Sequence, residues 1–379
     1  MSSSIDHEYS SRFWVRVILK ALFLFLGLNL LFGILDPMQF LGKLTIYNSF
    51  IPGRVRLPYG ENPASAYNLS LYNLPAMFAS HELAGAQKPP DEYRVILIGD
   101  SSTWGYLLAP DETLAAFINQ QQLRLPDGRL VRAYNLGYPV MSVTKDLLIL
   151  THALNYQPDL IVWPVTLESL PRSKQLFPPL LQNNPADVRK LIAAHDLNLD
   201  SNDPGFVEPD FYQKTLVGQR KEIADWLRLQ FYGILWAATR IDQELPDQYI
   251  PRQEDLSSDV SFHELQPPAL SESALALDVL EAGMDLAGNI PVLLINEPMF
   301  ISQGANSDLR YNFYYPRWAY DAYRELLLNL ANKNSWHYLD LWNSVDPTEF
   351  TNSAVHMSPL GTNQFAMQIG SEILRLQQP

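Results

Sequence analysis

Residues 93–105 read YRVILIGDSSTWG, and the fold that we expect follows from this stretch. The apolar run from Tyr93 to Ile98 is typical of a strand buried on both faces, and it ends at Gly99. The turn that follows carries Ser101, at the point where a strand gives way to a helix. Ligands bind at the carboxyl edge of open α/β sheets, so Ser101 is positioned for chemistry.

The rest of the chain alternates between strand and helix patterns. Further strands are expected at Leu130–Leu136, Asp159–Pro164, Ile290–Asn296 and His337–Leu341. Helices are expected at Glu112–Leu123, Ser142–Tyr156, Ser271–Ala287, Pro316–Asn332 and Leu360–Leu376. This alternation predicts an α/β domain of three layers, flavodoxin-like, with a central parallel sheet of five strands covered on both faces.

Charge and cysteine content exclude several function classes. The net charge of −14 argues against nucleic-acid binding, which needs a basic surface. The chain has no cysteine, which excludes disulfides, thiolate catalysis and cysteine metal sites. No metal-ligand spacing and no phosphate loop stand out, so we expect no metal and no cofactor.

Residues 13–35 read FWVRVILKALFLFLGLNLLFGIL and predict one transmembrane helix. Arg16 and Lys20 can reach the headgroups from within it. A cleaved signal peptide and a buried core helix are the alternatives, although no A-x-A cleavage site follows. With Arg12, the two basic residues place the N-terminus inside. We expect a single-pass protein of the cell membrane with an extracytoplasmic C-terminal domain.

The predicted organisation has four parts. Residues 1–12 form a cytoplasmic tail, 13–35 the transmembrane helix, 36–91 a connector and 92–379 the main domain. Within the main domain the alternation breaks at about 170–268, which we interpret as a helical insertion that forms a lid or a partner surface. A long aromatic-rich helix is expected in the insertion, at Phe211–Leu245.

His356 is the candidate base. It lies on the carboxyl side of the last strand, just before the last helix, and therefore at the same sheet edge as Ser101. A serine nucleophile needs such a base to take its proton. Taken singly, Ser101 and Ser102 are also compatible with helix capping, and His356 with a plain surface residue.

Three short blocks come in the order found in one known family. Gly99–Gly105, Asn135–Gly137 and His356–Gly361 resemble the first, second and last blocks of the SGNH/GDSL hydrolases, from about Tyr93 to the C-terminus. The resemblance implies Ser101 as nucleophile with Asp100 beside it in the catalytic motif, and the backbone N–H groups of Ser101 and Gly137 as oxyanion donors. The anchor and domain together resemble extracytoplasmic proteins that O-acetylate bacterial polysaccharides and peptidoglycan.

Two positions depart from the family pattern. Glu168 falls where the third block supplies an asparagine to the oxyanion hole, and an ionised carboxylate cannot donate. Ser353 stands three residues before His356, where the family has its acid. Other carboxylates are candidates for that acid: Asp346 and Glu349, and also Glu168, Asp340 and Glu297. A Ser–His dyad is the further alternative. Glu297 and Trp104 are expected to line the pocket.

The predicted function is a serine esterase or O-acyltransferase that acts on O-acyl groups of cell-envelope glycans or related esters through an acyl-enzyme at Ser101. The alternative is a catalytically degenerate protein of the same fold that binds a glycan or an integral membrane acyltransferase. The expected partners are a small-molecule ester or glycan, the membrane, and such an acyltransferase.

Overall fold

In this computed structural model the described residues are 10–46, 48, 53–60, 65, 68–85, 87–239 and 245–378. Residues 1–9 of the predicted tail and 240–244 of the predicted insertion lie outside them. Five strands form one parallel sheet in the order β2-β1-β3-β4-β5. Their bounds are β1 Glu92–Leu97, β2 Leu130–Asn135, β3 Leu160–Val165, β4 Val292–Asn296 and β5 His337–Asp340. The predicted sheet is confirmed, and its order is that of the flavodoxin-like folds.

Fourteen helices are found in the described part of the chain. They are α1 Ser11–Leu35, α2 Met38–Leu41, α3 Leu74–Ala79, α4 Glu82–Gly85, α5 Ser101–Trp104, α6 Leu114–Gln120, α7 Val143–Ala153, α8 Pro179–Gln182, α9 Pro185–His195, α10 Phe211–Lys214, α11 Arg220–Thr239, α12 Leu277–Ala287, α13 Arg317–Asn334 and α14 Pro359–Leu376.

The helices cover both faces of the sheet because successive strand side chains point to opposite sides. Ile96 and Ile98 pack into one apolar core with α7, α12 and α13. Val95 and Leu97 pack into a second core with α6 and α14. The three expected layers follow, with helices at the front and the back of a fully buried β1.

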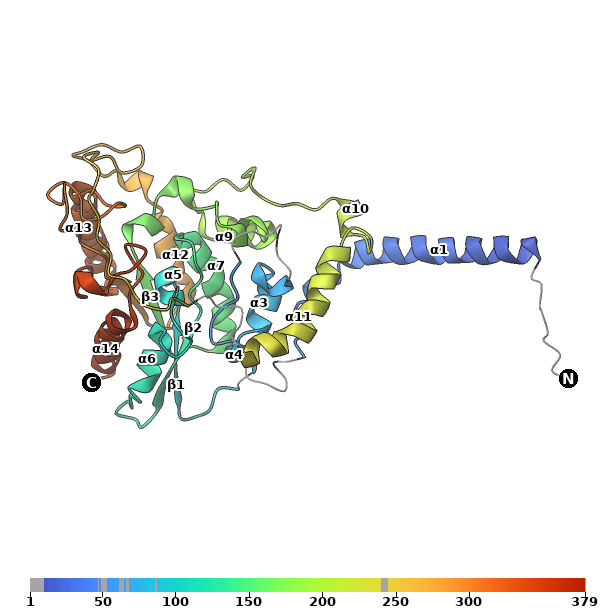
Figure 1. Cartoon of the computed structure of the whole chain (residues 1–379), viewed down its shortest axis with the longest axis horizontal. Coiled ribbons are helices and arrows are strands. Elements are labelled where there is room, and N and C mark those ends of the chain that lie inside the picture. The colour runs from blue at the N-terminus through green and yellow to red at the C-terminus, as the bar shows by residue number, and fades with distance from the viewer. Residues whose placement is uncertain are drawn as a thin grey trace.

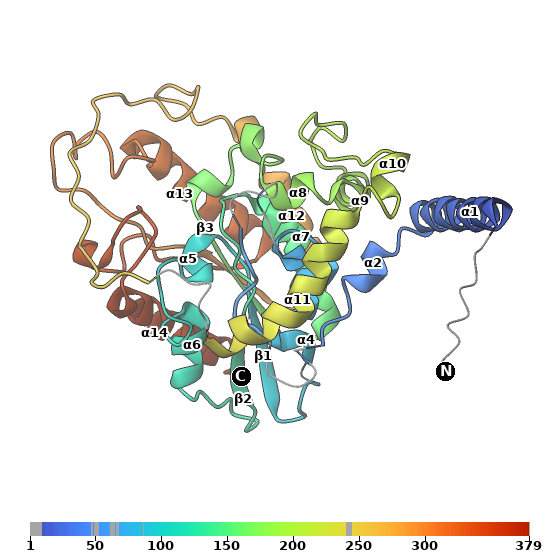
Figure 2. The same cartoon turned by 45° about the vertical axis from the view of Figure 1, so that its right-hand side comes forward.

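Helix α1 projects away from the domain (Figure 1). It is the one helix among the described residues that is long and apolar enough to cross a membrane. The chain then returns through α2, α3 and α4 along the side of the domain (Figure 2).

The expected helix at Phe211–Leu245 is instead divided into α10 and α11. Thr215 leaves the helical conformation with ψ 164°, and the turn after it packs against α1. The Val217 N–H donates to Asn29 Oδ1 at 3.0 Å, which is the tertiary contact that interrupts the helix.

His81 fixes the connector to the sheet. Its Nε2 lies 3.0 Å from the Asn135 carbonyl oxygen, and the Leu83 N–H donates to its Nδ1 at 3.1 Å. A neutral imidazole that donates from Nε2 and accepts at Nδ1 satisfies both contacts. Complete burial lowers the pKa of His81 to about 4, because the charged form loses its hydration.

We therefore expect acid to destabilise the protein through His81. Unfolding restores a pKa near 6.5, so the unfolded chain binds the extra proton between pH 6.5 and 4. The contribution of His81 is complete above pH 6.5 and falls by on the order of 3 kcal/mol as the pH reaches 4. Chemical denaturation at several pH values checks this against His81→Gln, which should lose less stability over that window. Equal losses in the two proteins would contradict the assignment.

Candidate active site

Ser101 and His356 meet at the carboxyl edge of the sheet. Ser101 opens α5 directly after β1, and His356 lies two residues before Ser358, whose side chain caps α14. The Ser101 Oγ is 2.8 Å from His356 Nε2, so a hydrogen bond joins residues 255 positions apart in the chain. This is the contact that a serine nucleophile and its general base require.

The side-chain amide of Asn352 is the second hydrogen-bond partner of the His356 ring. His356 Nδ1 lies 2.9 Å from Asn352 Oδ1, so Nδ1 carries the proton and Nε2 is left to accept from Ser101. The loop is held in turn by Arg252, which donates to the Asn352 carbonyl oxygen at 2.8 Å. The arrangement is Ser-His-Asn, and an asparagine in this role occurs in the Cys-His-Asn set of papain-like proteases.

The environment of His356 favours its neutral form. Burial, with a smaller effect from the positive charge of Arg252, lowers the pKa of His356 to about 4. The ring of Tyr106 stacks on the imidazole with centroids 4.8 Å apart. His356 is therefore unprotonated at neutral pH, and among the described residues its ring nitrogens bond to Asn352 and Ser101 and to no carboxylate.

The expected carboxylate partners of His356 lie elsewhere. Asp346 accepts from Thr348, and Glu349 accepts from the Ser358 hydroxyl. Asp340 pairs with Arg324. Neither Asp346 nor Glu349 orients the histidine. Asp346 bonds to Thr348 in its own loop, and Glu349 bonds to Ser358, which caps α14.

The Gly137 N–H is not available to an oxyanion. It donates to Asn135 Oδ1 at 3.0 Å. A Cβ on Gly137 would lie 2.5 Å from the Trp104 backbone nitrogen, so glycine serves the close approach of this loop to α5. The expectation that Gly137 completes the oxyanion hole is not supported.

Val140 is the better candidate. It has φ +82°, which is rare for a β-branched residue, and it lines the pocket with Ser101 and His356. Within the described part of the chain, no acceptor is found for the backbone N–H of Ser101 or of Val140. The Met141 N–H also lies at the pocket without such an acceptor, so the backbone of Ser101 and of the 140–141 segment offers the candidate oxyanion donors. Strained backbone of this kind is typical of functional sites, but it leaves no signal in a sequence.

Glu168 lines the pocket but does not donate to it. One of its oxygens pairs with Lys174, and the other lies 3.0 Å from His263 Nε2. The paired carboxylate thus places the Lys174 ammonium in the pocket. The Lys174 ammonium balances the negative charge of Glu168, a charge that an asparagine at this position would not carry.

Asp100 and Glu297 lie beneath the nucleophile, not in the pocket. Asp100 caps α5 by accepting from the Ser102 N–H at 2.8 Å. Its carboxylate lies close enough to the Glu297 carboxyl group for the two to interact electrostatically, and both residues are almost fully buried. Burial and the charge of Asp100 raise the pKa of Glu297 well above its usual range, so Glu297 holds a proton. Asp100 contacts neither Ser101 Oγ nor His356, which makes it a positioning residue.

Lys145 ties this layer together and was missed at the sequence level. Its ammonium group donates to the Gly99 and Tyr138 carbonyl oxygens at 2.6 and 2.9 Å, and it pairs with Asp146. It thereby joins the turn before Ser101 to the loop that carries Val140. A lysine within an apolar helix pattern was the only available signal.

Trp104 also points away from the pocket. Its indole N–H donates to the Leu57 carbonyl oxygen at 2.7 Å, and Arg56 lies over its ring at 4.3 Å. The expected pocket role is therefore replaced by docking of the connector onto α5.

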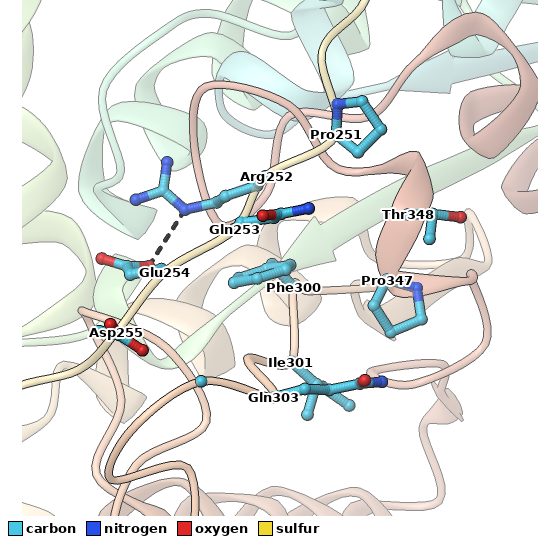
Figure 3. Close-up of a pocket in the computed structure, with 11 residues that line it drawn as sticks. Pro251, Arg252, Gln253, Glu254, Asp255, Phe300, Ile301, Gln303, Pro347 and Thr348 are labelled. Carbon is cyan, nitrogen blue, oxygen red and sulfur yellow. Dashed lines mark hydrogen bonds and ion pairs between the residues drawn. The ribbon is translucent and has the colours of Figure 1, made fainter.

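The pocket over Ser101 has a volume of about 250 Å³, which is small. It shares Glu168 and Tyr314 with a neighbouring pocket of about 560 Å³. That pocket in turn shares Glu254 and Asp255 with a third, of about 490 Å³, where Arg252 is hydrogen-bonded to Glu254 (Figure 3). A track of three pockets thus leads outward from the nucleophile. In the described part of the chain, no group of three His, Asp or Glu side chains is arranged to hold a metal ion.

No protein-family model and no curated protein matches the chain. Solved structures give distant likenesses. Est24, a carbohydrate acetylesterase from Sinorhizobium meliloti, is 11% identical with a TM-score of 0.34, over 75% of this chain and 99% of that one. An inhibitor-bound aryl esterase of M. smegmatis is 12% identical with a TM-score of 0.33, over 75% and 99%. Likeness at this level carries no functional argument, so the function is argued from the site itself.

Substitutions at Asn352 test the Ser-His-Asn assignment. Asn352→Asp should raise the pKa of His356 by about 1–3 units, because a carboxylate beside the ring stabilises the imidazolium. Hydrolysis of an aryl acetate followed as kcat/KM against pH reports the change. Wild type should lose activity only near pH 4, and the variant at a higher pH. Asn352→Ala should turn over slowly with its acid limb still near pH 4. An unmoved limb in the aspartate variant would contradict the Ser-His-Asn assignment.

Substitutions at Val140 test whether its backbone is strained. Glycine normally lowers stability relative to alanine, but at φ +82° the order should reverse. We expect Val140→Gly to be about 1 kcal/mol more stable than Val140→Ala, since only the latter keeps the Cβ clash. Both variants retain the backbone N–H and should retain esterase turnover. Denaturant titrations of the pair measure the difference, and a more stable alanine variant would show that the position is unstrained.

Proposed function

We propose that this chain is an SGNH/GDSL-type serine esterase or O-acyltransferase. The 2.8 Å hydrogen bond between Ser101 Oγ and His356 Nε2 carries the proposal. It supplies an activated hydroxyl at the carboxyl edge of a parallel sheet, next to a small pocket and two free backbone N–H groups.

The reaction follows from these groups. Ser101 Oγ attacks the ester carbonyl carbon while His356 Nε2 takes the hydroxyl proton. The N–H groups of Ser101 and Val140 stabilise the oxyanion. Collapse of the intermediate breaks the ester C–O bond, and His356 returns the proton to the departing alcohol. The acyl group on Ser101 then passes to water or to a hydroxyl acceptor, whose proton His356 accepts in turn.

The shape of the site favours a small acyl group on a larger alcohol. The pocket of about 250 Å³ over Ser101 suits a short acyl chain, and the two adjoining pockets extend the track along the insertion. Phe177 and Phe313 are large, partly exposed aromatic side chains on these walls. Aromatic faces of this kind offer stacking surfaces to sugar rings, which supports an O-acylated cell-envelope glycan as the substrate.

The anchor belongs to the same proposal. Helix α1 is 25 residues long and largely exposed, as a membrane-spanning helix would be. Arg12, Arg16 and Lys20 near its start favour a cytoplasmic N-terminus and an extracytoplasmic catalytic domain.

A second candidate is a non-catalytic glycan-binding protein, or one that binds an integral membrane acyltransferase. It is favoured by the amide in place of the acid at His356 and by the carboxylate at Glu168. Loss of the orienting acid costs about 10⁴-fold in turnover in the serine proteases, which leaves room for a slow or inactive site.

The test that separates the two candidates is acyl release from p-nitrophenyl acetate by the full chain in detergent. Wild type should turn over, and Ser101→Ala should lose at least about 10³-fold, since no other hydroxyl contacts His356 Nε2 in the described residues. Ser371→Ala on α14 alters an exposed serine far from the site and should keep the wild-type rate. A wild-type rate no higher than that of Ser101→Ala would favour the binding protein.

A further inference from the structure

The domain packs against the last turns of α1. Asn29 and Gly33 are the buried residues of this helix, whereas residues 11–28 are exposed. Asn29 Oδ1 accepts from the Val217 N–H at 3.0 Å. A Cβ on Gly33 would lie 3.2 Å from the ring of Phe211, so glycine lets α10 approach the helix closely.

The part of α1 that is free of contacts with the domain is too short to span a bilayer. The apolar stretch Phe13–Leu28 reaches only about 24 Å at 1.5 Å per residue, and the hydrocarbon core of a bilayer is about 30 Å thick. If α1 spans the membrane, the hydrocarbon must extend past Asn29, to the elements of the domain that surround the helix there.

Those elements carry an exposed apolar surface, which we call the apron. It comprises large side chains of α10, α11 and the segment around α2: Phe40, Leu44, Ile46, Phe211, Tyr212, Leu227, Phe231, Tyr232 and Leu235. Figure 1 shows α10 and α11 on the side of the domain from which α1 projects, and Figure 2 shows α2 at the base of α1.

The apron is built on one face of α11. Leu227, Phe231 and Leu235 follow at intervals of four and so form a single exposed stripe. Residues about 100° round α11 from the stripe fix the helix to α2 and the segment after it. The Trp226 indole donates to the carbonyl oxygen of Leu41, the last residue of α2, and the Gln230 amide donates to that of Leu44. The stripe therefore has a defined orientation and is not part of the core.

Charge at the apron differs from that of the whole molecule. The chain has a net charge of −14, but residues 211–236 carry four basic residues against two acidic ones. The basic residues are Lys214, Arg220, Lys221 and Arg228, and the acidic ones are Glu222 and Asp225. Basic side chains flanking an apolar, aromatic stripe are the composition of a helix that lies in the interface of a bilayer with anionic lipids.

We propose that the apron enters the interfacial region of the bilayer that α1 spans, so that the catalytic domain is docked on the membrane surface and not merely tethered to it. The inference rests on the anchoring of α1 proposed above. It identifies lipid as the occupant because Phe211, the first side chain of the apron, packs against α1 at Gly33, where the apolar helix meets the domain.

The natural absence of cysteine allows a direct test. Single-cysteine variants of the full chain carry an environment-sensitive fluorophore in nanodiscs of phosphatidylcholine and phosphatidylglycerol, with and without quencher-bearing lipids. Phe231→Cys and Leu235→Cys probe the apron, at side chains 70% and 54% exposed. Met367→Cys on α14, 57% exposed, is the matched control away from α1. Phe23→Cys, 83% exposed, probes the middle of α1.

We expect lipid quenchers to reduce fluorescence at positions 231 and 235, and at 23, but not at 367. Quenching at 23 with positions 231 and 235 as unaffected as 367 would overturn the docking while leaving the anchor intact. A protein partner on the apron would give that same absence of lipid quenching together with a blue-shifted emission. No quenching at 23 would overturn the anchor and the docking together. Retained p-nitrophenyl acetate hydrolysis keeps the esterase proposal separate from both.

Discussion

The hydrogen bond between Ser101 and His356 depends on the sheet edge that brings two distant loops together. Ser101 follows β1, and His356 precedes α14, which packs on the same face of the sheet as α6. The strand order places β1 beside β3 at the centre, where the connections leave in opposite directions and a crevice forms. Any change that shifts β1 or α14 by an ångström would lengthen the 2.8 Å contact beyond useful reach.

Beneath that contact, buried charge fixes the backbone. Lys145 binds the carbonyl oxygens of Gly99 and Tyr138, so one ammonium group positions both the nucleophile turn and the loop that ends at Val140. Asp100 caps α5, and its buried charge raises the pKa of the neighbouring Glu297, which holds a proton. A buried ion is costly unless it is paired and fully hydrogen-bonded. Such an arrangement is better suited to holding one geometry than to adding stability.

The sequence predicted the parts of this structure that depend on local pattern. Short apolar runs predicted the five strands and helical patterns predicted the helices between them, and the position of the strand ends placed Ser101 and His356 at one edge. It could not predict Asn352 as the partner of His356, because the choice among nearby polar residues depends on how the loop before α14 turns and on Arg252 from the insertion. The turn at Thr215 was missed for the same reason, since a tertiary contact with Asn29 interrupts a good helix pattern. The sequence pointed to Gly137 and gave no sign of Val140, because the direction of a backbone N–H group cannot be inferred from residue type.

The amide at Asn352 gives a protonated His356 less electrostatic stabilisation than a carboxylate would. An aspartate would raise the pKa of His356 and stabilise the imidazolium, whereas the amide only selects the tautomer. The histidine is therefore a weak base that remains neutral well into the acid range. In the proposed reaction the charge of the transition state is then balanced by donors at the pocket, namely the backbone N–H groups of Ser101 and Val140. Glu168 is compatible with the proposed catalysis because the Lys174 ammonium balances its negative charge, and the ion pair has no net charge. The amide at Asn352 and the paired carboxylate at Glu168 therefore leave the backbone N–H groups as the main source of oxyanion stabilisation in the proposed reaction.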